Sequence, residues 1–146
     1  MKNFLFLILS VVFIFSSVSC KKNVDHNYPT TFVYNNPTSH AIEIKIESNY
    51  TPMEFTLAPG ENFSKIWVIG FGPVPIDLTK ADIMFDGKYH VVHNGIETES
   101  KYHNICDIDN YVKSDDPEIE HGRVLTFTFT EADYEYAVSS EDSEQN

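Results

Sequence analysis

The sequence predicts an all-β fold, an antiparallel β-sandwich of about seven or eight short strands that ends in a short C-terminal helical turn. Three observations support this class. Apolar and polar residues alternate with a period of two in several segments, clusters of turn-forming residues separate these segments, and a helical period appears only near the C-terminus. With 146 residues, the chain is expected to form one domain.

The N-terminal segment predicts export and lipid attachment. Lys2 precedes a mostly apolar run over residues 4–15, which is shorter than the roughly 20 residues that a membrane-spanning helix needs. Small residues beginning at Ser17 then lead into Cys20 and resemble a bacterial lipobox, although most lipoboxes carry Leu where Ser17 stands. We expect residues 1–19 to be a lipoprotein signal peptide that is removed; the alternative is an ordinary secretory signal that contains a cysteine.

Lipid on Cys20 would place the mature protein on a membrane of the bacterial cell envelope, because two acyl chains anchor stably. Lys21 follows where some bacteria use Asp as an inner-membrane retention signal, which favours the outer membrane. No acidic cluster follows the cysteine, which favours the periplasmic face over the cell surface. The formal charge of -12 argues against nucleic acid as a partner and against electrostatic adhesion to anionic lipid.

Polar residues 20–29 lack periodicity and predict a flexible tether, so the sandwich domain is expected over residues 30–138. A first short strand is expected around Phe32–Tyr34. In His40–Glu47, isoleucines alternate with charged residues, which predicts a strand with one buried and one solvated face.

The next two expected strands, Met53–Leu57 and residues 63–69, are joined by a turn at Pro59 and should form a hairpin. The second strand becomes continuously apolar toward its end, as in strands covered on both faces. Trp67 and Phe71 allow two interpretations: a candidate binding loop whose rings contact a sugar or a protein, or a core residue with a phenylalanine that plugs one end of the sandwich. The core interpretation is favoured.

A hairpin is also expected over residues 81–94, and its register follows from which residues must share the buried face. A loop of three residues, Phe85 to Gly87, would pair Ile83 with Tyr89. The glycine of that loop would occupy the left-handed region of a bulged hairpin.

Metal-ligating residues do not form a convincing site. His90 and His93 lie three apart on a strand and therefore point to opposite faces; a zinc site that includes His103 stays an alternative. Residues 107–110 hint at a calcium loop but lack the donors that should follow. We expect no metal and no cofactor, and we expect Cys106 to be a small buried residue.

The closing strand is expected at Arg123–Thr130, with its large apolar residues inward and its threonines outward. Thr130 and Asp133 then have the spacing of a helix N-cap followed by a carboxylate, which predicts one or two helical turns over residues 131–137. The acidic segment 139–146 is expected to be disordered.

Thr126–Tyr134, together with Asn104-Ile105, Asn110-Tyr111, the Pro59–Glu61 turn and the loose lipobox, resembles small uncharacterised lipoproteins of the Bacteroidota type. The resemblance implies a lipid-anchored sandwich with no catalytic residue to carry over. The sandwich should be immunoglobulin-like at most, because one cysteine in the folded part cannot form the inter-sheet disulfide.

Known catalytic motifs are absent from the sequence: it contains no Gly-x-Ser-x-Gly elbow, no phosphate-binding loop and no His-Glu-x-x-His helix. We therefore expect a binding or assembly module of the cell envelope, not an enzyme, with a protein or glycan as partner. The loop from Trp67 to Pro75, with Tyr50 and Tyr102, could supply aromatic contacts. The alternative is a small envelope hydrolase that uses carboxylates and histidines on the loops.

Overall fold

The computed structural model describes residues 27–49, 52–67, 72–73, 78–95 and 103–144. The elements are β1 (Asn27–Tyr28), β2 (Thr30–Asn35), β3 (Ile42–Ser48), β4 (Met53–Leu57), β5 (Asn62–Trp67), β6 (Gly72–Pro73), β7 (Leu78–Phe85), β8 (Tyr89–Asn94), η1 (Ile108–Asn110), β9 (Val112–Asp115), β10 (Arg123–Thr128) and α2 (Glu131–Glu144).

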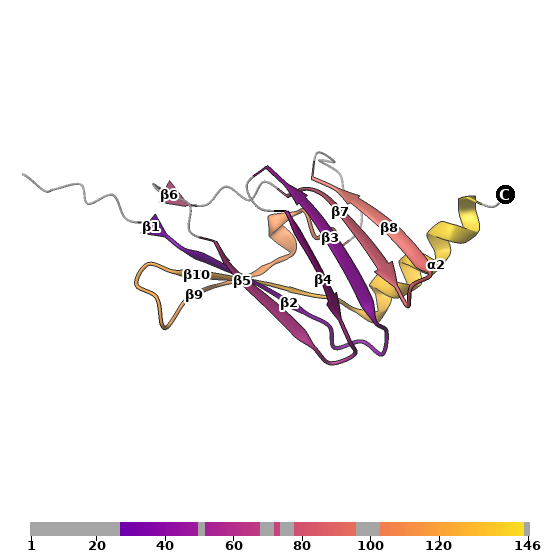
Figure 1. Ribbon diagram of the computed structural model, residues 1–146, viewed down its shortest axis with the longest axis horizontal. Coiled ribbons are helices and arrows are strands. Elements are labelled where there is room, and N and C mark those ends of the chain that lie inside the picture. Colours follow the sequence, from indigo (N-terminus) through magenta and orange to yellow (C-terminus); the bar gives the residue numbers. More distant parts are fainter. Residues whose placement is uncertain (1–26, 50–51, 68–71, 74–77, 96–102, 145–146) are drawn as a thin grey trace, which may run out of the picture.

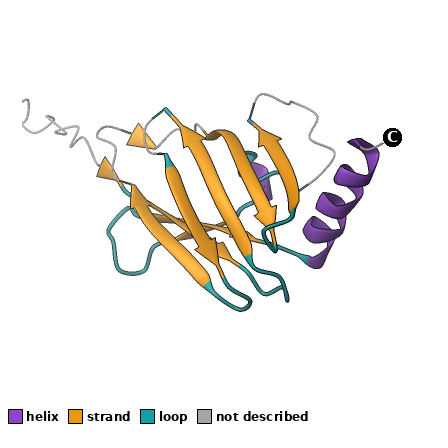
Figure 2. Ribbon diagram, turned by 45° about the vertical axis from the view of Figure 1, so that its right-hand side comes forward, coloured by secondary structure: helices purple, strands orange, loops and turns teal. Residues whose placement is uncertain are grey.

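Two four-stranded sheets pack face to face, and α2 lies at one end of them (Figures 1 and 2). The first sheet has the order β5-β2-β10-β9 and the second has the order β4-β3-β7-β8; β1 and β6 form a separate short pair. The predicted class, a mostly β protein with a sandwich-like pair of sheets and a C-terminal helix, is therefore confirmed.

The centre of the first sheet differs from the all-antiparallel prediction, because β2 and β10 run parallel. Parallel neighbours need a long connection. These two strands lie near opposite ends of the chain, and the whole second sheet is built between them, so the connection is long enough. The pairs β2–β5 and β9–β10 are antiparallel.

The predicted hairpin of β4 and β5 is wrong, because the turn between them crosses from one sheet to the other. β4 pairs with β3, whereas β5 pairs with β2. Asn36 holds this crossing: its backbone N–H donates to Glu61 O at 2.9 Å, and its side chain donates to the carbonyls of Leu57 and Ala58. A strand followed by Pro59-Gly60 looks the same in the sequence whether the next strand pairs with it in one sheet or crosses to the other sheet.

The β7–β8 hairpin forms with a register two residues from the predicted one. Ile83 pairs with Val91 and Phe85 with Tyr89, so the inward and outward faces are as predicted although the partners are not. Gly87 has a φ of 64°, in the predicted left-handed region. The loop starts one residue later than predicted because Phe85 is fully buried and stays in the strand.

The core lies between the sheets and consists of the inward residues of both. The three isoleucines of β3 are buried, as the alternation predicted. The largest fully buried apolar side chains are Tyr34, Phe32, Phe85, Phe127, Phe129, Ile42, Ile44, Ile46, Leu57, Ile83 and Ile105.

Both ends of the domain extend beyond the predicted limits. At the N-terminal side, residues 27–29 already belong to the fold, before the predicted start at residue 30, because β1 pairs with β6 and Arg123 N donates to Pro29 O at 3.0 Å. At the other end α2 continues to Glu144, so the prediction of a disordered tail at 139–146 is wrong for that part. The unfavourable step in helix formation is nucleation, so a helix whose first turn is capped and packed can extend by further residues at little cost in free energy.

Candidate functional site

Trp67, the first residue of the predicted binding loop, lies in the core. Its side chain is 3% exposed, and its ring centroid is 4.7 Å from that of Phe32. The ring therefore cannot serve as a surface platform, and the core interpretation is confirmed for this residue. Phe71, Tyr50, Tyr102 and the predicted lipid-attachment residue Cys20 lie outside the described residues.

Cys106 is a buried thiol with low reactivity. Its Sγ contacts the carbonyl of His93 at 3.7 Å, and burial raises its pKa to about 12. The reactive form of cysteine is the thiolate, which is scarce at neutral pH when the pKa is this high. The interpretation of Cys106 as a small buried residue agrees with this environment.

The three histidines of the zinc alternative are not brought together. His90 is exposed on the outer face of β8, whereas His93 is 8% exposed and faces the core. His103 lies against Asp133 at the start of α2, with Nδ1 3.1 Å from Oδ1. Within the described ranges, no group of three or more His, Cys, Asp or Glu side chains could hold a metal ion.

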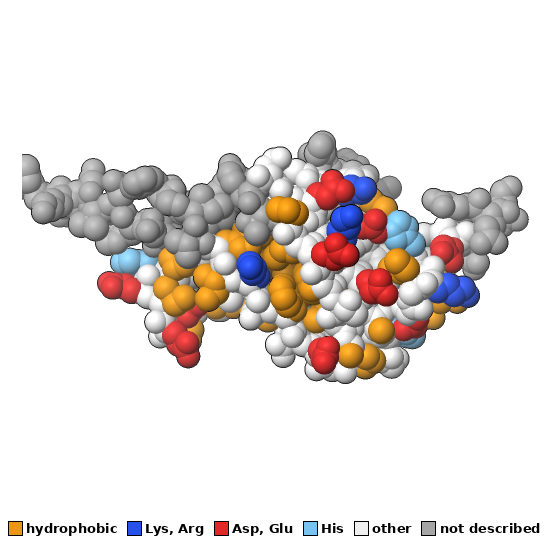
Figure 3. All heavy atoms as spheres, in the orientation of Figure 1, with side chains coloured by type: hydrophobic (Ala, Val, Ile, Leu, Met, Phe, Trp, Pro, Cys, Tyr) orange, Lys and Arg blue, Asp and Glu red, His pale blue; other side chains and the backbone are white. Residues whose placement is uncertain are grey.

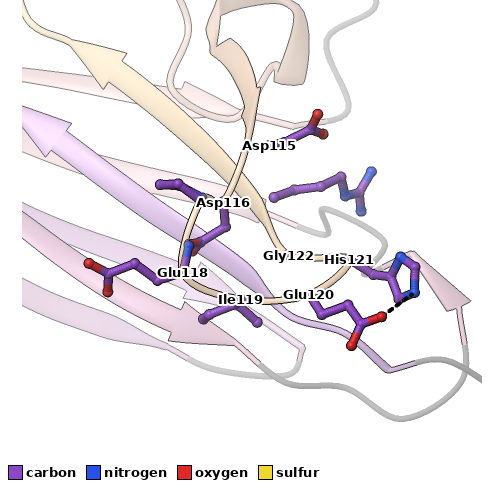
Figure 4. A pocket seen from close by; sticks show the side chains of 9 residues that line it. Asp115, Asp116, Glu118, Ile119, Glu120, His121 and Gly122 are labelled. Carbon is purple, nitrogen blue, oxygen red and sulfur yellow. Dashed lines mark hydrogen bonds and ion pairs between the residues drawn. The ribbon is translucent and has the colours of Figure 1, made fainter.

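The acidic loop, residues 115–123 between β9 and β10, encloses a hollow of about 650 Å³ (Figure 4). Its backbone closes on itself: Asp116 N donates to Gly122 O at 2.9 Å, and Asp116 Oδ1 accepts from Glu118 N at 2.9 Å. The labelled carboxylates point in different directions instead of converging (Figure 4). This is the geometry of a solvated turn.

A cluster around His40 joins three parts of the chain at the helix end of the sandwich: the β2–β3 loop, the β7–β8 loop and α2. His40 Nδ1 lies 2.7 Å from Asp86 Oδ2, and its Nε2 lies 3.3 Å from Glu131 Oε2. The ring stacks on Tyr134 with centroids 3.5 Å apart. The hydrogen bond from His40, with that from the Ala41 N–H, lowers the pKa of Asp86. Because both ring nitrogens face carboxylates, His40 ties these elements together and has no free nitrogen for a substrate.

His103 and Asp133 form the pair that best fits the hydrolase alternative. Asp133 is buried and accepts hydrogen bonds from Thr130 N at 2.6 Å, from the Thr130 hydroxyl at 2.8 Å and from His103. Burial raises the pKa of Asp133, but these hydrogen bonds outweigh it and the net shift is downward. In a nucleophile–base–acid system, a carboxylate orients the base, and the base must in turn contact a nucleophile such as a hydroxyl or a thiol. Within the part of the chain that the structure describes, no hydroxyl or thiol side chain donates to His103.

The outer face of the second sheet is charged. A shallow groove of about 190 Å³ runs across it, and Lys45 in this groove has Glu54 and Asp82 as its cross-strand partners. His90 pairs with Asp82. Charged side chains of both signs lie side by side over β3, β7 and β8 (Figure 3). The charged members of the face are Glu43, Lys45, Glu47, Glu54, Lys80 and Asp82.

The outer face of the first sheet carries no Asp, Glu, Lys or Arg on any of its four described strands. We call it the neutral face. Its central residues are half-buried and its edge residues exposed, with Ile66 at 52% and Val112 at 70%. Register and alternation give its members as Thr31, Val33, Asn35, Asn62, Ser64, Ile66, Val112, Ser114, Val124, Thr126 and Thr128.

The edges of the first sheet are protected, unlike its face. Lys65 on β5 and Lys113 on β9 lie on the inward parity, in one row with Phe32 and Leu125. Inward-pointing charges on edge strands hinder the addition of another strand. With respect to the strands that the structure describes, the neutral face is therefore the part of this sheet that is available to a partner.

Sequence reasoning missed the neutral face because it needs the sheet order. The signal was present in part: the residues that alternate with the core in Thr30–Asn35 and Arg123–Thr128 are Thr, Val and Asn, not charged residues. Only the pairing of β2 with β10, which are distant in the sequence, joins these two segments into one surface.

No helix among the described residues has the length and apolar character needed to cross a membrane. Comparisons with protein-family models, with curated proteins and with solved structures found no match to this chain.

Proposed function

We propose that the chain is a lipid-anchored binding or assembly module of the bacterial cell envelope, of the Bacteroidota lipoprotein type. Acyl chains on Cys20 would hold it in the outer membrane, on the periplasmic face. The observation that carries the proposal is the contrast between the two outer sheet faces: one is densely charged, and the other carries no charge in a chain whose formal charge is -12.

The position of β1 indicates which end of the domain would face the membrane. Residues 21–26 separate Cys20 from β1, and at about 3.3–3.6 Å per residue they reach at most roughly 25 Å. β1 and α2 lie at opposite ends of the molecule (Figure 1). The β1 end would then lie near the membrane and α2 away from it, with both outer sheet faces accessible to envelope partners.

A binding role fits the side chains better than catalysis does. Both ring nitrogens of His40 are engaged by carboxylates, and the Cys106 thiol is held in its protonated form by burial. The one observation that favours the hydrolase alternative is the buried Asp133 that orients His103.

We keep the immunoglobulin-like relationship as part of the proposal in its loosest form, a sandwich of two packed sheets. In antibody domains the first two strands share a sheet. Here β2 and β3 lie in different sheets, and Cys106 is a free cysteine, so the similarity would be one of architecture alone.

Membrane partition tests the anchoring. The full chain, expressed in a bacterium that processes lipoproteins, should remain in washed membranes and enter detergent, whereas Cys20→Ala should stay unprocessed or wash free. Cys106→Ala, which removes the other cysteine, should partition like the wild type. Equal membrane retention of wild type and Cys20→Ala would contradict the proposal. Ester or glycoside turnover that is lost in His103→Gln would favour the hydrolase instead.

A further inference from the structure

We infer that the neutral face binds the neutral face of a second copy of this chain, so that the module assembles with itself. The inference rests on the proposed function, because it names the partner of the proposed assembly module. The surface is the outer face of the first sheet, with β2 and β10 at its centre.

The distribution of charge favours this face as the interface and a second copy of the chain as the partner. Two copies that each carry a formal charge of -12 repel one another wherever their charged surfaces meet. The neutral face avoids that repulsion, and a second copy always offers a matching uncharged surface. A carboxylate lies at the rim of this face, where Asp116 Oδ2 accepts a hydrogen bond from the Thr31 hydroxyl at 3.4 Å.

The arrangement of the face suits two-fold symmetry. Val33 and Thr126 are register partners on the two central strands, β2 and β10, and both point outward. A two-fold axis that runs parallel to the sheet, above this pair and midway between the two copies, would place each copy's Val33 and Thr126 against those of the other copy. Small β-branched side chains at the centre allow two sheets to approach to about 10 Å, the usual distance in aligned sheet packing.

The size of the face predicts a weak dimer. Four strands about 4.8 Å apart and about six residues long give a footprint of roughly 400 Å² per copy, or about 800 Å² for the pair. Stable interfaces bury about 1,200–2,000 Å² in total. Lipid anchoring would compensate, because confinement to one membrane raises the effective concentration of the copies.

Charge substitution at the centre of the face tests the inference. Thr126→Lys and Thr126→Glu should each weaken self-association at least tenfold, because every charge then meets its own copy. An equimolar mixture of the two variants should recover pairing, since opposite charges then meet. Thr56→Lys and Thr56→Glu, on the outer face of the second sheet, are matched controls and should pair like the wild type.

Energy transfer between donor- and acceptor-labelled full chains on phosphatidylethanolamine–phosphatidylglycerol vesicles measures the pairing. Loss in both Thr126 variants, recovery in their mixture and unchanged controls would support the inference. Unchanged pairing in the single variants, or no recovery in the mixture, would overturn it. The same series in the Cys20→Ala background, in solution at high concentration, separates the two proposals. Even if anchoring fails, the Thr126 variants should still lose pairing there when alone and recover it when mixed.

Discussion

Asn36 is the polar residue on which the connection between the two sheets depends. It is 1% exposed, and its side-chain N–H groups donate to the carbonyls of His40, Leu57 and Ala58. Its Oδ1 accepts from the N–H and the hydroxyl of Thr38. One buried amide therefore fixes both the β2–β3 loop and the β4–β5 crossing.

Asn36→Ala should lower the free energy of unfolding by about 2–4 kcal/mol, because several buried groups lose their partners at once. Urea unfolding of the processed chain measures the loss. Asn35→Ala, next in sequence but on the neutral face, should change stability by less than about 1 kcal/mol. Equal effects of the two substitutions would contradict the structural role given to Asn36.

The same residue shows where sequence reasoning reaches its limit. An Asn after a strand is typical of a turn, and Asn36 does lie in the loop between β2 and β3. The identity of the carbonyls that satisfy a buried amide is a property of the folded chain. Trp67 is the opposite case: its place within a continuous apolar run indicated the core, and its burial at 3% exposure agrees.

Alternation along single strands was the most reliable signal at the level of elements. It identified the buried faces of β3, β7 and β10 correctly, because a period of two fixes which side chains share a face. Pairing was less predictable. The β7–β8 register was two residues off, a shift that leaves the face of every side chain unchanged and so is invisible to the pattern.

The start of α2 was predicted from Thr130 and Asp133, and the structure shows the reciprocal bonds: Thr130 N donates to Asp133 Oδ2 at 2.6 Å, and Asp133 N to the Thr130 hydroxyl at 3.4 Å. The length of α2 was not predicted, because Ser139–Glu144 contains no apolar residue. Packing of Tyr134 and Ala137 against the sandwich anchors the first turns, and the later turns extend from them.

The cap of α2 should give stability a specific dependence on pH. The folded-state pKa of Asp133 is lowered, so its contribution is complete above the unfolded value of about 3.9 and is lost as the pH falls through the lower folded value. Asp133→Asn should therefore cost about 1–3 kcal/mol at pH 7. The difference from wild type should shrink below about pH 4.

Urea unfolding at pH 7 and at pH 3 measures that difference, with the exposed Glu135→Gln as the control on the same helix. A constant gap between wild type and Asp133→Asn across this range would show that the carboxylate is not stabilised by Thr130 and His103.

At the scale of the whole molecule, the distribution of charge gives the two sheets different roles. The second sheet has the expected surface of a solvated antiparallel sheet, polar outside and apolar inside. The first sheet is apolar inside and neutral outside, with inward lysines at both edges. This combination hinders strand addition and leaves an uncharged face, which is why we assign self-association to the first sheet and not to the loops or to the acidic loop between β9 and β10.

Site-specific photocrosslinking in intact cells tests the central claim most directly. A photoreactive amino acid at Val33, at the centre of the neutral face, should give an adduct with the mass of two copies of the chain. The same amino acid at Lys45, on the charged outer face of the second sheet, should give none. An adduct at Lys45 but not at Val33, or an adduct at Val33 with a different protein, would contradict self-assembly through the neutral face.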